Sequence, residues 1–490
     1  MALIGPPEPS ANPLSVVIDD LRAERAASVP FPPGKRSFSL PRTRRIVTDP
    51  LELLLDAYQR YGPIFTLRLM HQPVVFMIGP EANHYILVSH AQNFHWREGH
   101  FRELIGLLGD GLLTIDGDFH RRSRQIMLPA FHHKQIEASV DIVLEEAGRA
   151  IDRWEVGQEL DLYAWTRRLA LRIAMRAVFG LDPDGAEARR VDAAELFTTA
   201  LGYFSRDPLL RMLRGPGSPW ARMGEARREL NRLIYSEIAR RRASGERGLD
   251  VLSLLLDAKD EDGSTLSEEQ IRDEVMTLLF AGHDTTTSTL AFMFYELARH
   301  PELQRPLIEE QERVLAGRPR PGAEHLTGTG LPQLEMVLEE TLRMYPPAWI
   351  GPRRSLEPFE FGGFTVPERA FVNYSSWVSH HLPHVFPDPE RFEPERFEAE
   401  RKAALPKGAY IPFGGGSRTC IGMRFGQLEI RAIATLILSR CSLVTPAGLE
   451  LRIRQAPTIG PRDGLPVRVA ERGPSSSSAA PGLDGEALAA

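Results

Sequence analysis

The spacing of apolar and polar residues changes along the chain and separates β-rich segments from a long helical region. Two runs rich in β-branched and aromatic residues, at 64–69 and 74–78, flank a short turn and predict a hairpin. Between about 81 and 345 the helical period dominates. Strand signals return at 359–361 and 370–374. The pattern predicts a mainly α fold with a smaller β-rich part (α+β).

Proline, glycine and serine mark the segments where regular structure is expected to stop. Residues 1–40 carry many prolines and predict a loosely structured approach segment, and 208–220 predict a mobile loop between helices. Residues 451–469 predict a last hairpin, and the serine-rich stretch after it predicts disorder. We therefore expect an approach segment at 1–44, a single folded domain at 45–470 and a disordered tail at 471–490.

One predicted helix is unusually long. Ser267 with Gln270 three residues later forms a capping-box start, and no breaker follows before Pro301. A helix of about 33 residues would span roughly 50 Å. It is apolar on both sides of one polar stretch at 281–288, where hydroxyls and a carboxylate are costly to bury unless they are used. One use is structural, with threonines bonding back to carbonyls and bending the helix; the other is chemical.

Composition and charge exclude several classes of protein. A net charge of −6 and a pI near 6.2 argue against a nucleic-acid partner. The two cysteines, Cys420 and Cys441, suggest no disulfide framework, which fits a reducing compartment. No stretch approaches the roughly 18 to 20 apolar residues that a membrane span needs, and the first residues lack the features of a signal peptide. We expect a soluble, cytoplasmic, monomeric protein without an integral membrane segment.

The strongest chemical signal is a cysteine in a glycine-rich segment. Residues 413–422 read F-G-G-G-S-R-T-C-I-G, and a helical stretch at 423–438 follows at once. A thiolate at Cys420 would lie at a helix N-terminus, where the dipole and free N–H groups favour negative charge. The glycines let the backbone come close to a flat ligand. The alternative is a buried structural cysteine, which is the commoner fate of this residue.

The spacing F-x-x-G-x-R-x-C-x-G resembles the haem-binding signature of the cytochromes P-450. The resemblance implies the P-450 fold, with the long central helix over the haem and the cysteine loop beneath it. It implies haem b (iron protoporphyrin IX) as cofactor, Cys420 as the protein ligand of the iron, and Phe413, Gly414 and Arg418 as further haem-binding residues of the loop. It would also make 45–470 one haem domain, with no room for a fused reductase.

The polar stretch of the long helix resembles the A-G-x-D-T-T motif of the same family. By that resemblance Ala281 and Gly282 let the helix pass over a porphyrin face, and the Thr285 hydroxyl could hold dioxygen on that face. Asp284 would relay protons from solvent, since splitting the O–O bond needs two protons without flooding the site with water. Family members that only rearrange peroxides tend to lack this pair.

Two further sets of residues match family positions. Haem propionates need cationic or hydrogen-bonding partners; the resemblance implies His120, Arg124, Arg353 and Arg418 for this role. His120 stands where the family often has tryptophan, and each arginine could alternatively be solvated surface. The second set is structural: Glu340, Arg343 and Arg396, the last within a P-E-R-F segment, would form a buried triad that fixes the chain before the cysteine loop.

Together these residues predict a haem-thiolate monooxygenase, which converts RH, O₂, two electrons and two protons into ROH and water. Its substrate would be a lipophilic small molecule of the fatty-acid, terpenoid or steroid type, and its electrons would come from a ferredoxin or flavodoxin with an NAD(P)H reductase. One alternative is a peroxide-dependent or isomerising haem-thiolate enzyme, which the Asp284–Thr285 pair disfavours. A second is a non-catalytic haem or gas-binding protein, which the absence of an output domain disfavours.

Overall fold

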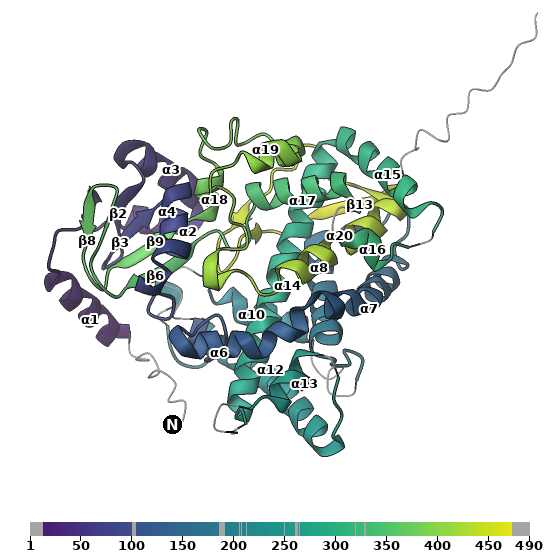
Figure 1. Cartoon of the computed structure of the whole chain (residues 1–490), viewed down its shortest axis with the longest axis horizontal. Coiled ribbons are helices and arrows are strands. Elements are labelled where there is room, and N and C mark those ends of the chain that lie inside the picture. Colours follow the sequence, from purple (N-terminus) through teal and green to yellow (C-terminus); the bar gives the residue numbers. More distant parts are fainter. Residues whose placement is uncertain are drawn as a thin grey trace, which may run out of the picture.

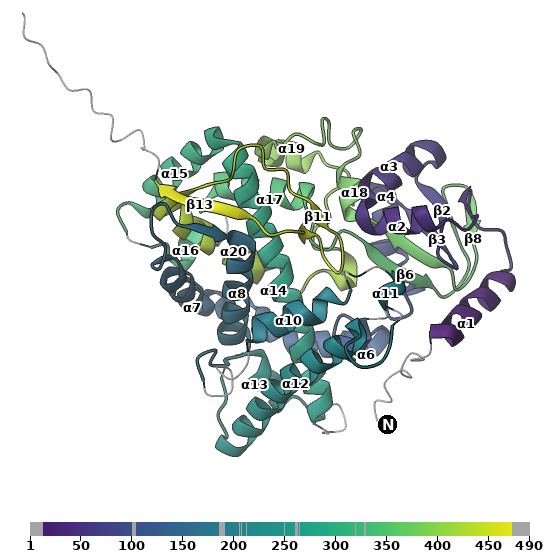
Figure 2. The same cartoon turned by 180° about the vertical axis from the view of Figure 1, so that it is seen from behind.

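The computed structural model describes residues 13–472, except for 100–103, 186–191, 260–262, 328–329 and the single positions 205, 207, 212, 249, 264 and 319. A β-rich part carries the N-terminal helices and lies at one side of the molecule, and a larger helical body forms the other side (Figures 1 and 2). The predicted tail at 471–490 falls, from 473 on, outside the described residues. The predicted mainly α fold with a smaller β part is confirmed.

The helices follow one another over most of the chain. Their bounds are α1 Pro13–Arg25, α2 Leu40–Thr48, α3 Pro50–Tyr61, α4 Pro80–His84, α5 Ile105–Leu108, α6 Gly117–Met127, α7 His133–Ile151, α8 Leu162–Ile173, α10 Ala193–Gly202, α11 Pro208–Arg211, α12 Pro219–Ser244, α13 Val251–Asp257, α14 Glu268–Arg299, α15 Pro301–Leu315, α16 Ala323–Leu326, α17 Pro332–Met344, α18 Ser376–His380, α19 Ala399–Ala403 and α20 Met423–Arg440.

Among the described residues the strands form one larger sheet and three small ones. Their bounds are β1 Gly34–Lys35, β2 Ile64–Leu69, β3 Gln72–Met77, β4 Phe94–His95, β5 Glu159–Asp161, β6 Gly351–Ser355, β7 Phe359–Phe361, β8 Phe364–Val366, β9 Phe371–Tyr374, β10 Cys441–Val444, β11 Ile453–Arg454, β12 Gly460–Pro461 and β13 Pro466–Glu471. The larger sheet has the order β1-β2-β3-β9-β6-β4, and the small ones are β10-β13-β5, β11-β12 and β7-β8.

The β-rich predictions were right about most strands and wrong about some partners. The first hairpin is confirmed, with β2 and β3 antiparallel and Ile64 opposite Met77. The Gly362–Gly363 turn joins β7 to β8, a strand that the sequence pattern missed, whereas β9 enters the larger sheet between β3 and β6. The last hairpin is only two residues deep, between β11 and β12, because β13 pairs with β10 instead. Side-chain alternation identifies a strand but does not select its neighbour.

The N-terminal segment is more ordered than its prolines suggest. The prediction of a loosely structured stretch at 1–40 is wrong for the described part, since it contains α1 and a strand parallel to β2. Asp20 of α1 is buried and accepts hydrogen bonds from Gln72 at 2.6 Å and Arg354 at 3.4 Å. The helix is therefore anchored to two strands of the larger sheet.

The predicted break at 208–220 is also smaller than expected. The four-residue helix α11 occupies 208–211, and Pro219 and Trp220 already belong to α12. Ser218 caps α12 by accepting the N–H of Ala221 at 3.1 Å, and proline is favourable in a first helical turn because its missing N–H would have no partner there. The irregular stretch thus shortens to 213–218 within the described residues.

The long helix predicted from its capping box is α14. Ser267 accepts the N–H of Gln270 at 3.1 Å, and the Gln270 side chain accepts the N–H of Ser267 at 2.9 Å. The helix runs through the middle of the molecule in both views and packs against α8, α17 and α20 (Figures 1 and 2). Because neighbours surround it, almost all of its residues from Ile271 to Leu297 are buried, polar ones included.

A buried ion-pair network fixes the chain before the cysteine segment, as predicted. Arg343 donates to both carboxylate oxygens of Glu340, at 2.7 and 2.9 Å, and Nε of Arg396 lies 3.4 Å from the same carboxylate. The Glu340 carboxylate also accepts the N–H of Glu393 at 2.9 Å, and Arg343 donates to the carbonyl of Pro389 at 2.8 Å. Glu340 and Arg343 are fully buried, so the loss of either side chain would leave an uncompensated charge in the core.

Candidate active site

The cysteine segment is a closed loop that ends at the start of α20. The Cys420 N–H donates to the carbonyl of Phe413 at 2.9 Å, and the Gly414 N–H donates to the carbonyl of Ile411 at 3.1 Å. Gly414 has a left-handed φ of 69°, which a glycine adopts without strain. These bonds fix the position of Cys420 relative to α20.

Gly416 serves a contact that the sequence analysis did not foresee. A Cβ at Gly416 would lie 2.0 Å from the carbonyl oxygen of Leu87, in the helical turn η1 at Tyr85–Ser89, and its φ is 60°. The close approach here is thus to protein backbone. At Gly414, in contrast, a Cβ would meet nothing closer than 3.7 Å, so this position stays open to a ligand.

The thiol of Cys420 is accessible yet poorly solvated. The residue is exposed, although desolvation raises the pKa of its thiol. The N–H of Gly422, which donates to the sulfur, and the charge of Arg124 work in the opposite direction and favour the thiolate. Because the residue is exposed, a ligand can reach it. Cys441 is buried in the helical core, and both cysteines are free, as predicted.

One face of α14 is accessible in the middle of an otherwise buried helix. Ala281 is exposed and Gly282 and Thr285 are half-buried, whereas the residues around them are buried. Ala281 and Thr285 are four positions apart and therefore share a face. On an adjacent side Thr286 contacts α20, where its hydroxyl lies 3.4 Å from the carboxylate of Glu429. The accessible face thus lies beside the helix that begins just after Cys420.

The threonines of this stretch bond back to the helix, as the structural alternative proposed. Thr285 donates to the carbonyl of Ala281 at 2.6 Å, Thr287 to that of His283 at 2.7 Å, and Thr289 to that of Thr285 at 3.0 Å. Among these three only Thr285 is accessible. The Thr285 hydroxyl proton is donated to the Ala281 carbonyl, but the Thr285 oxygen still has a lone pair that can accept a hydrogen bond.

Asp284 points away from this face into a buried polar cluster. Its carboxylate is fully buried and lies 3.3 Å from Arg167 of α8 and 3.1 Å from Arg454 of β11. Thr458 donates a hydrogen bond to the same carboxylate. Burial alone would raise the pKa of Asp284, but the two guanidinium charges hold it at about 2. The side chain is therefore ionised at neutral pH.

A cluster of cations surrounds the cysteine segment. Arg418 bonds to the Asp116 carboxylate and donates to the carbonyl of Ile115 at 2.6 Å. Burial, together with the nearby charges of Arg353 and Arg124, lowers the pKa of Arg418 to about 10. Within the described residues no carboxylate pairs with Arg353 or Arg124. Of these three guanidinium groups, only that of Arg418 pairs with a carboxylate among the described residues.

His120 belongs to the same cluster. It is buried on α6, and desolvation together with the charges of Arg418 and Arg124 lowers its pKa to about 4. The ring is therefore neutral at pH 7 and can donate a hydrogen bond, but it adds no charge. The structure brings together all four residues that the sequence analysis assigned to the propionates.

These residues fit a bound haem. A flat, dianionic ligand would supply the two carboxylates that the cluster of Arg124, Arg353 and Arg418 lacks. The accessible thiol of Cys420 offers a soft ligand for its iron. No cluster of three or more His, Cys, Asp or Glu side chains suited to a metal ion occurs among the described residues, so the structure offers no competing metal centre of that kind there.

Sequence reasoning missed the residues that surround the candidate catalytic pair. Arg167 and Arg454 lie 117 and 170 residues from Asp284, and no motif marks them. Tyr163 accepts hydrogen bonds from both arginines at 2.9 Å. Asp116, the partner of Arg418, was also missed; only its place just before α6 could have pointed to it.

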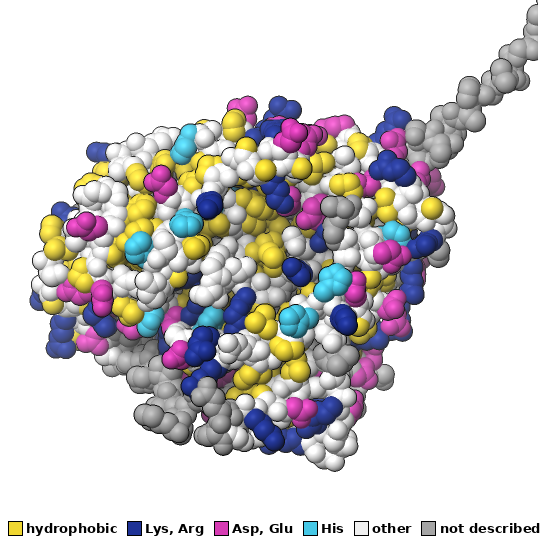
Figure 3. Space-filling view, viewed as in Figure 1, with side chains coloured by type: hydrophobic (Ala, Val, Ile, Leu, Met, Phe, Trp, Pro, Cys, Tyr) yellow, Lys and Arg dark blue, Asp and Glu magenta, His cyan; other side chains and the backbone are white. Residues whose placement is uncertain are grey.

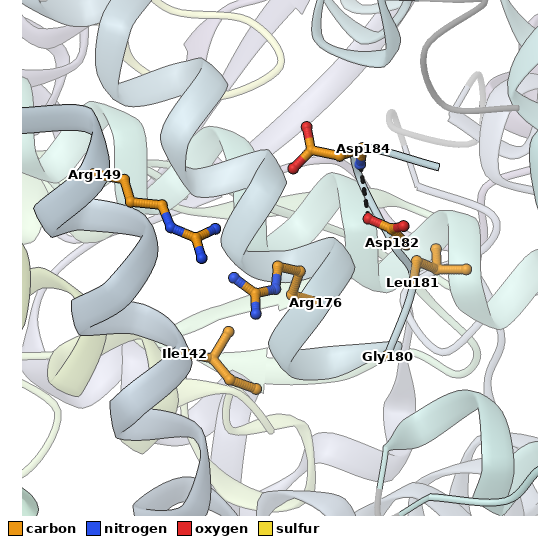
Figure 4. A pocket seen from close by; sticks show the side chains of 7 residues that line it. All are labelled: Ile142, Arg149, Arg176, Gly180, Leu181, Asp182 and Asp184. Carbon is orange, nitrogen blue, oxygen red and sulfur yellow. Dashed lines mark hydrogen bonds between the residues drawn. The ribbon is translucent and has the colours of Figure 1, made fainter. Parts of the chain in front are cut away.

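A hollow of about 360 Å³ opens elsewhere, beside α7 and the end of α8, and none of the candidate residues lines it. Figure 4 shows Arg149 and Arg176 extending toward each other from neighbouring helices. Both guanidinium groups pair with Glu145 and Glu146, so their charge is compensated. We assign no chemistry to this hollow.

Comparison with known proteins agrees with the geometry. Residues 30–459 match the family model described as Cytochrome P-450. The chain is 34% identical to cyclooctat-9-en-7-ol 5-monooxygenase of Streptomyces melanosporofaciens over 86% of this chain and 92% of the relative. It is 33% identical to cyclooctatin synthase of the same organism over 85% and 91%. A retinoic-acid-bound cyanobacterial structure, CYP120A1, superposes with a TM-score of 0.81 at 28% identity and covers 91% of this chain and 100% of its own.

Proposed function

Because the chain belongs to the cytochrome P-450 family, we propose that it inserts one oxygen atom into a lipophilic small molecule. The site of this reaction would be formed by Cys420, the accessible face of α14 and the arginine cluster. The enzyme is a haem b monooxygenase. The observation that supports the assignment of residues is the accessible Cys420 directly before α20, the helix whose Glu429 carboxylate lies 3.4 Å from the hydroxyl of Thr286, next to the accessible Thr285 of α14.

Each candidate residue has a proposed task. Cys420 would ligate the iron, and Phe413 and Gly414 would shape the loop around it. Arg124, Arg353 and Arg418 would hold the propionates, with the neutral His120 donating a hydrogen bond. Bound haem supplies the iron that takes up dioxygen and electrons and activates oxygen for insertion.

The proton chemistry falls to Thr285 and Asp284. The Thr285 oxygen would accept or pass a proton at the accessible face, next to Ala281. Asp284, ionised and held by Arg167 and Arg454, would move a proton only after its carboxylate leaves these partners. Tyr163 and Thr458 complete the buried cluster around Asp284, since Tyr163 accepts hydrogen bonds from both arginines and Thr458 donates one to the Asp284 carboxylate.

Replacing Thr285 by alanine tests the monooxygenase assignment. Substrate binding should persist, while product formed per NAD(P)H should fall about tenfold and hydrogen peroxide should rise, because one hydrogen bond at the reacting oxygen is lost. Thr287→Ala is the matched control, since Thr287 bonds back to the helix in the same way but is buried. Unchanged coupling in Thr285→Ala, or turnover with hydrogen peroxide but not with NAD(P)H, would favour the peroxide-dependent alternative.

Among lipophilic substrates, we propose a terpenoid-type molecule. The relatives at 33–34% identity are named for cyclooctat-9-en-7-ol and cyclooctatin, and the solved structure holds retinoic acid, an isoprenoid acid. Apolar side chains from Leu278 to Phe280 precede the accessible face of α14. Spin-state titration should give tighter binding of retinoic acid or a cyclic terpene alcohol than of lauric acid or progesterone. Tighter binding of lauric acid or progesterone would instead indicate a fatty acid or a steroid as the substrate class.

Electrons would come from a separate acidic protein, a ferredoxin or a flavodoxin. We place its docking site on the side of the cysteine segment, the short path to the iron. Figure 3 shows several Lys, Arg and His side chains near the middle of one face, with few acidic ones among them. Lys407 and Arg424 are exposed, and no described acidic side chain pairs with either. Arg121 of α6 contributes little uncompensated charge, because the Asp118 carboxylate lies 3.2 Å from its guanidinium group.

Reversing the charge at Lys407 and Arg424 should slow reduction by an acidic ferredoxin at least about tenfold at low salt, with less effect at high salt, since steering of charged partners is screened by salt. Substrate affinity and the carbon monoxide spectrum should not change. Arg462→Glu is the control, an exposed arginine next to the small β11-β12 sheet. Equal reduction rates in the double variant and the control would show that the docking site lies elsewhere.

A further inference from the structure

Two adjacent carboxylates of α14 hold the backbone of a neighbouring loop. The Asp273 carboxylate accepts the N–H of Asp110 at 2.6 Å, and the Glu274 carboxylate accepts the N–H of Leu112 at 2.8 Å. Both side chains are buried. The loop, Gly109–Thr114, is closed on itself by Thr114, whose hydroxyl donates to the carbonyls of Gly109 and Gly111.

The loop lies so close to α14 that two of its positions admit no side chain. A Cβ at Gly111 would lie 2.1 Å from the Thr277 hydroxyl and 2.5 Å from the carbonyl of Asp273. A Cβ at Gly109 would lie 2.2 Å from the Asp273 carboxylate, and the φ of Gly109 is 75°. Real side chains do not come this close, so both glycines are required by the contact.

The same loop is also connected, through Arg97, to the acidic partner of the arginine cluster. Arg97 donates to the Asp110 carboxylate at 2.6 Å, and its own N–H donates to Asp116 at 2.8 Å. Asp116 is the acidic partner of Arg418, and α6 with His120 begins directly after it. Glu274 also accepts a hydrogen bond from Ser123 of α6. The loop therefore bridges α14 and the propionate cluster.

Helical spacing places the loop next to the accessible face. Glu274 precedes Ala281 by seven positions and Thr285 by eleven, so the three lie along one stripe of α14. Leu112 packs in the same core as Leu278 and Phe280. The loop thus contacts α14 at Asp273, Glu274 and Thr277, and Thr277 lies one helical turn before the accessible Ala281.

We propose that Asp273 and Glu274 are positioning residues that hold the Gly109–Thr114 loop as a fixed wall of the substrate cavity, and thereby decide how large a molecule fits above the haem. The proposal rests on the proposed function, since it presupposes that the accessible face of α14 is the substrate side.

Energetics support a positioning role over a stabilising one. Burial raises the pKa of Glu274 to about 8 and that of Asp273 to about 6, so both carboxyls cost free energy in their ionised forms. A well-packed apolar residue would stabilise a core at lower cost. An apolar residue, however, could not accept hydrogen bonds from the N–H groups of Asp110 and Leu112, and therefore could not fix the backbone of the loop.

Azole binding tests the proposal without turnover. Imidazole and econazole both ligate haem iron and shift its absorption, but only econazole is large enough to reach a cavity wall. In Glu274→Ala and Gly111→Ala the dissociation constant of econazole should change about tenfold, because a buried N–H loses its partner or the loop is pushed off the helix, while that of imidazole should change by no more than about twofold. Glu274→Gln, which mimics the neutral acid and still accepts the N–H, should restore econazole binding.

The controls separate this idea from a merely structural role and from failure of the proposed function. Glu269→Gln, on an exposed position of the same helix, should leave both constants unchanged. If Glu274→Ala does not fold, Glu274→Asp tests the same contact more mildly and Gly111→Ala tests it from the loop. Equal shifts for both azoles, or unchanged econazole binding in every loop variant, would overturn the proposal. Absence of any azole shift in the unaltered protein would instead contradict the haem site itself.

Discussion

Replacing Cys420 by histidine is expected to abolish the strongly red-shifted absorption band that the reduced, carbon-monoxide-bound protein should show. That band depends on a thiolate ligand, and an imidazole donates less electron density to the iron. The arginine cluster of Arg124, Arg353 and Arg418 stays intact in this variant, so haem should still bind. Monooxygenase turnover should fall below detection, because the thiolate is what favours cleavage of the O–O bond.

The second cysteine provides the control for this experiment. Cys441 is buried at the end of α20, where burial raises the pKa of its thiol to about 11, and its sulfur lies 3.7 Å from the carbonyl of Ile437. Cys441→Ser should therefore leave the carbon monoxide spectrum unchanged. An unshifted band in the unaltered, folded protein would falsify the assignment of Cys420 as the iron ligand.

The sequence could predict the parts of this fold that are encoded locally. The Ser267–Gln270 capping box and the proline after His300 gave the bounds of α14 to within a residue, because each signal acts through atoms a few positions away. The β2-β3 hairpin followed for the same reason. The triad of Glu340, Arg343 and Arg396 came from a family resemblance, since Arg396 lies more than 50 residues after the other two.

What the sequence could not predict depends on contacts between distant segments. The ionisation of Asp284 depends on its ion pair with Arg454, 170 residues away in the sequence. No motif around Arg454 predicts this contact. The placement of β9 between β3 and β6 likewise depends on strands more than 270 residues apart. In the sequence Gly111 has the features of an ordinary turn glycine. The structure shows that a Cβ at Gly111 would lie 2.1 Å from the hydroxyl of Thr277. Local propensity does not predict which distant segments come into contact.

The clamped state of Asp284 constrains how protons can reach the accessible face. At neutral pH the carboxylate, with its pKa held near 2, carries no proton to give. The ion pairs with Arg167 and Arg454 also stabilise the fold: their contribution is complete above the ordinary pKa of 3.8 and is lost as the pH falls toward 2. A relay through Asp284 therefore requires the carboxylate to leave its two partners transiently.

Replacing Asp284 by asparagine should separate these two roles of the carboxylate. Turnover should fall about a hundredfold, with a larger solvent isotope effect, because a group that moves protons is lost. The free energy of unfolding should also drop by about 3 kcal/mol, because two buried guanidinium groups lose their counter-ion.

A double variant, Asp284→Asn with Arg454→Met, removes one of the uncompensated charges and should recover much of the lost stability. If Asp284 relays protons, this variant should remain as slow as Asp284→Asn, since neither asparagine nor methionine can take up and release a proton near neutral pH. If Asp284 serves only to hold α8 and β11 against α14, turnover should recover together with stability. Substrate titrations and the carbon monoxide spectrum, both independent of proton delivery, show whether each variant keeps an intact site. Recovery of turnover in the double variant would therefore rule out the relay and leave Thr285 as the remaining candidate for proton transfer at the accessible face.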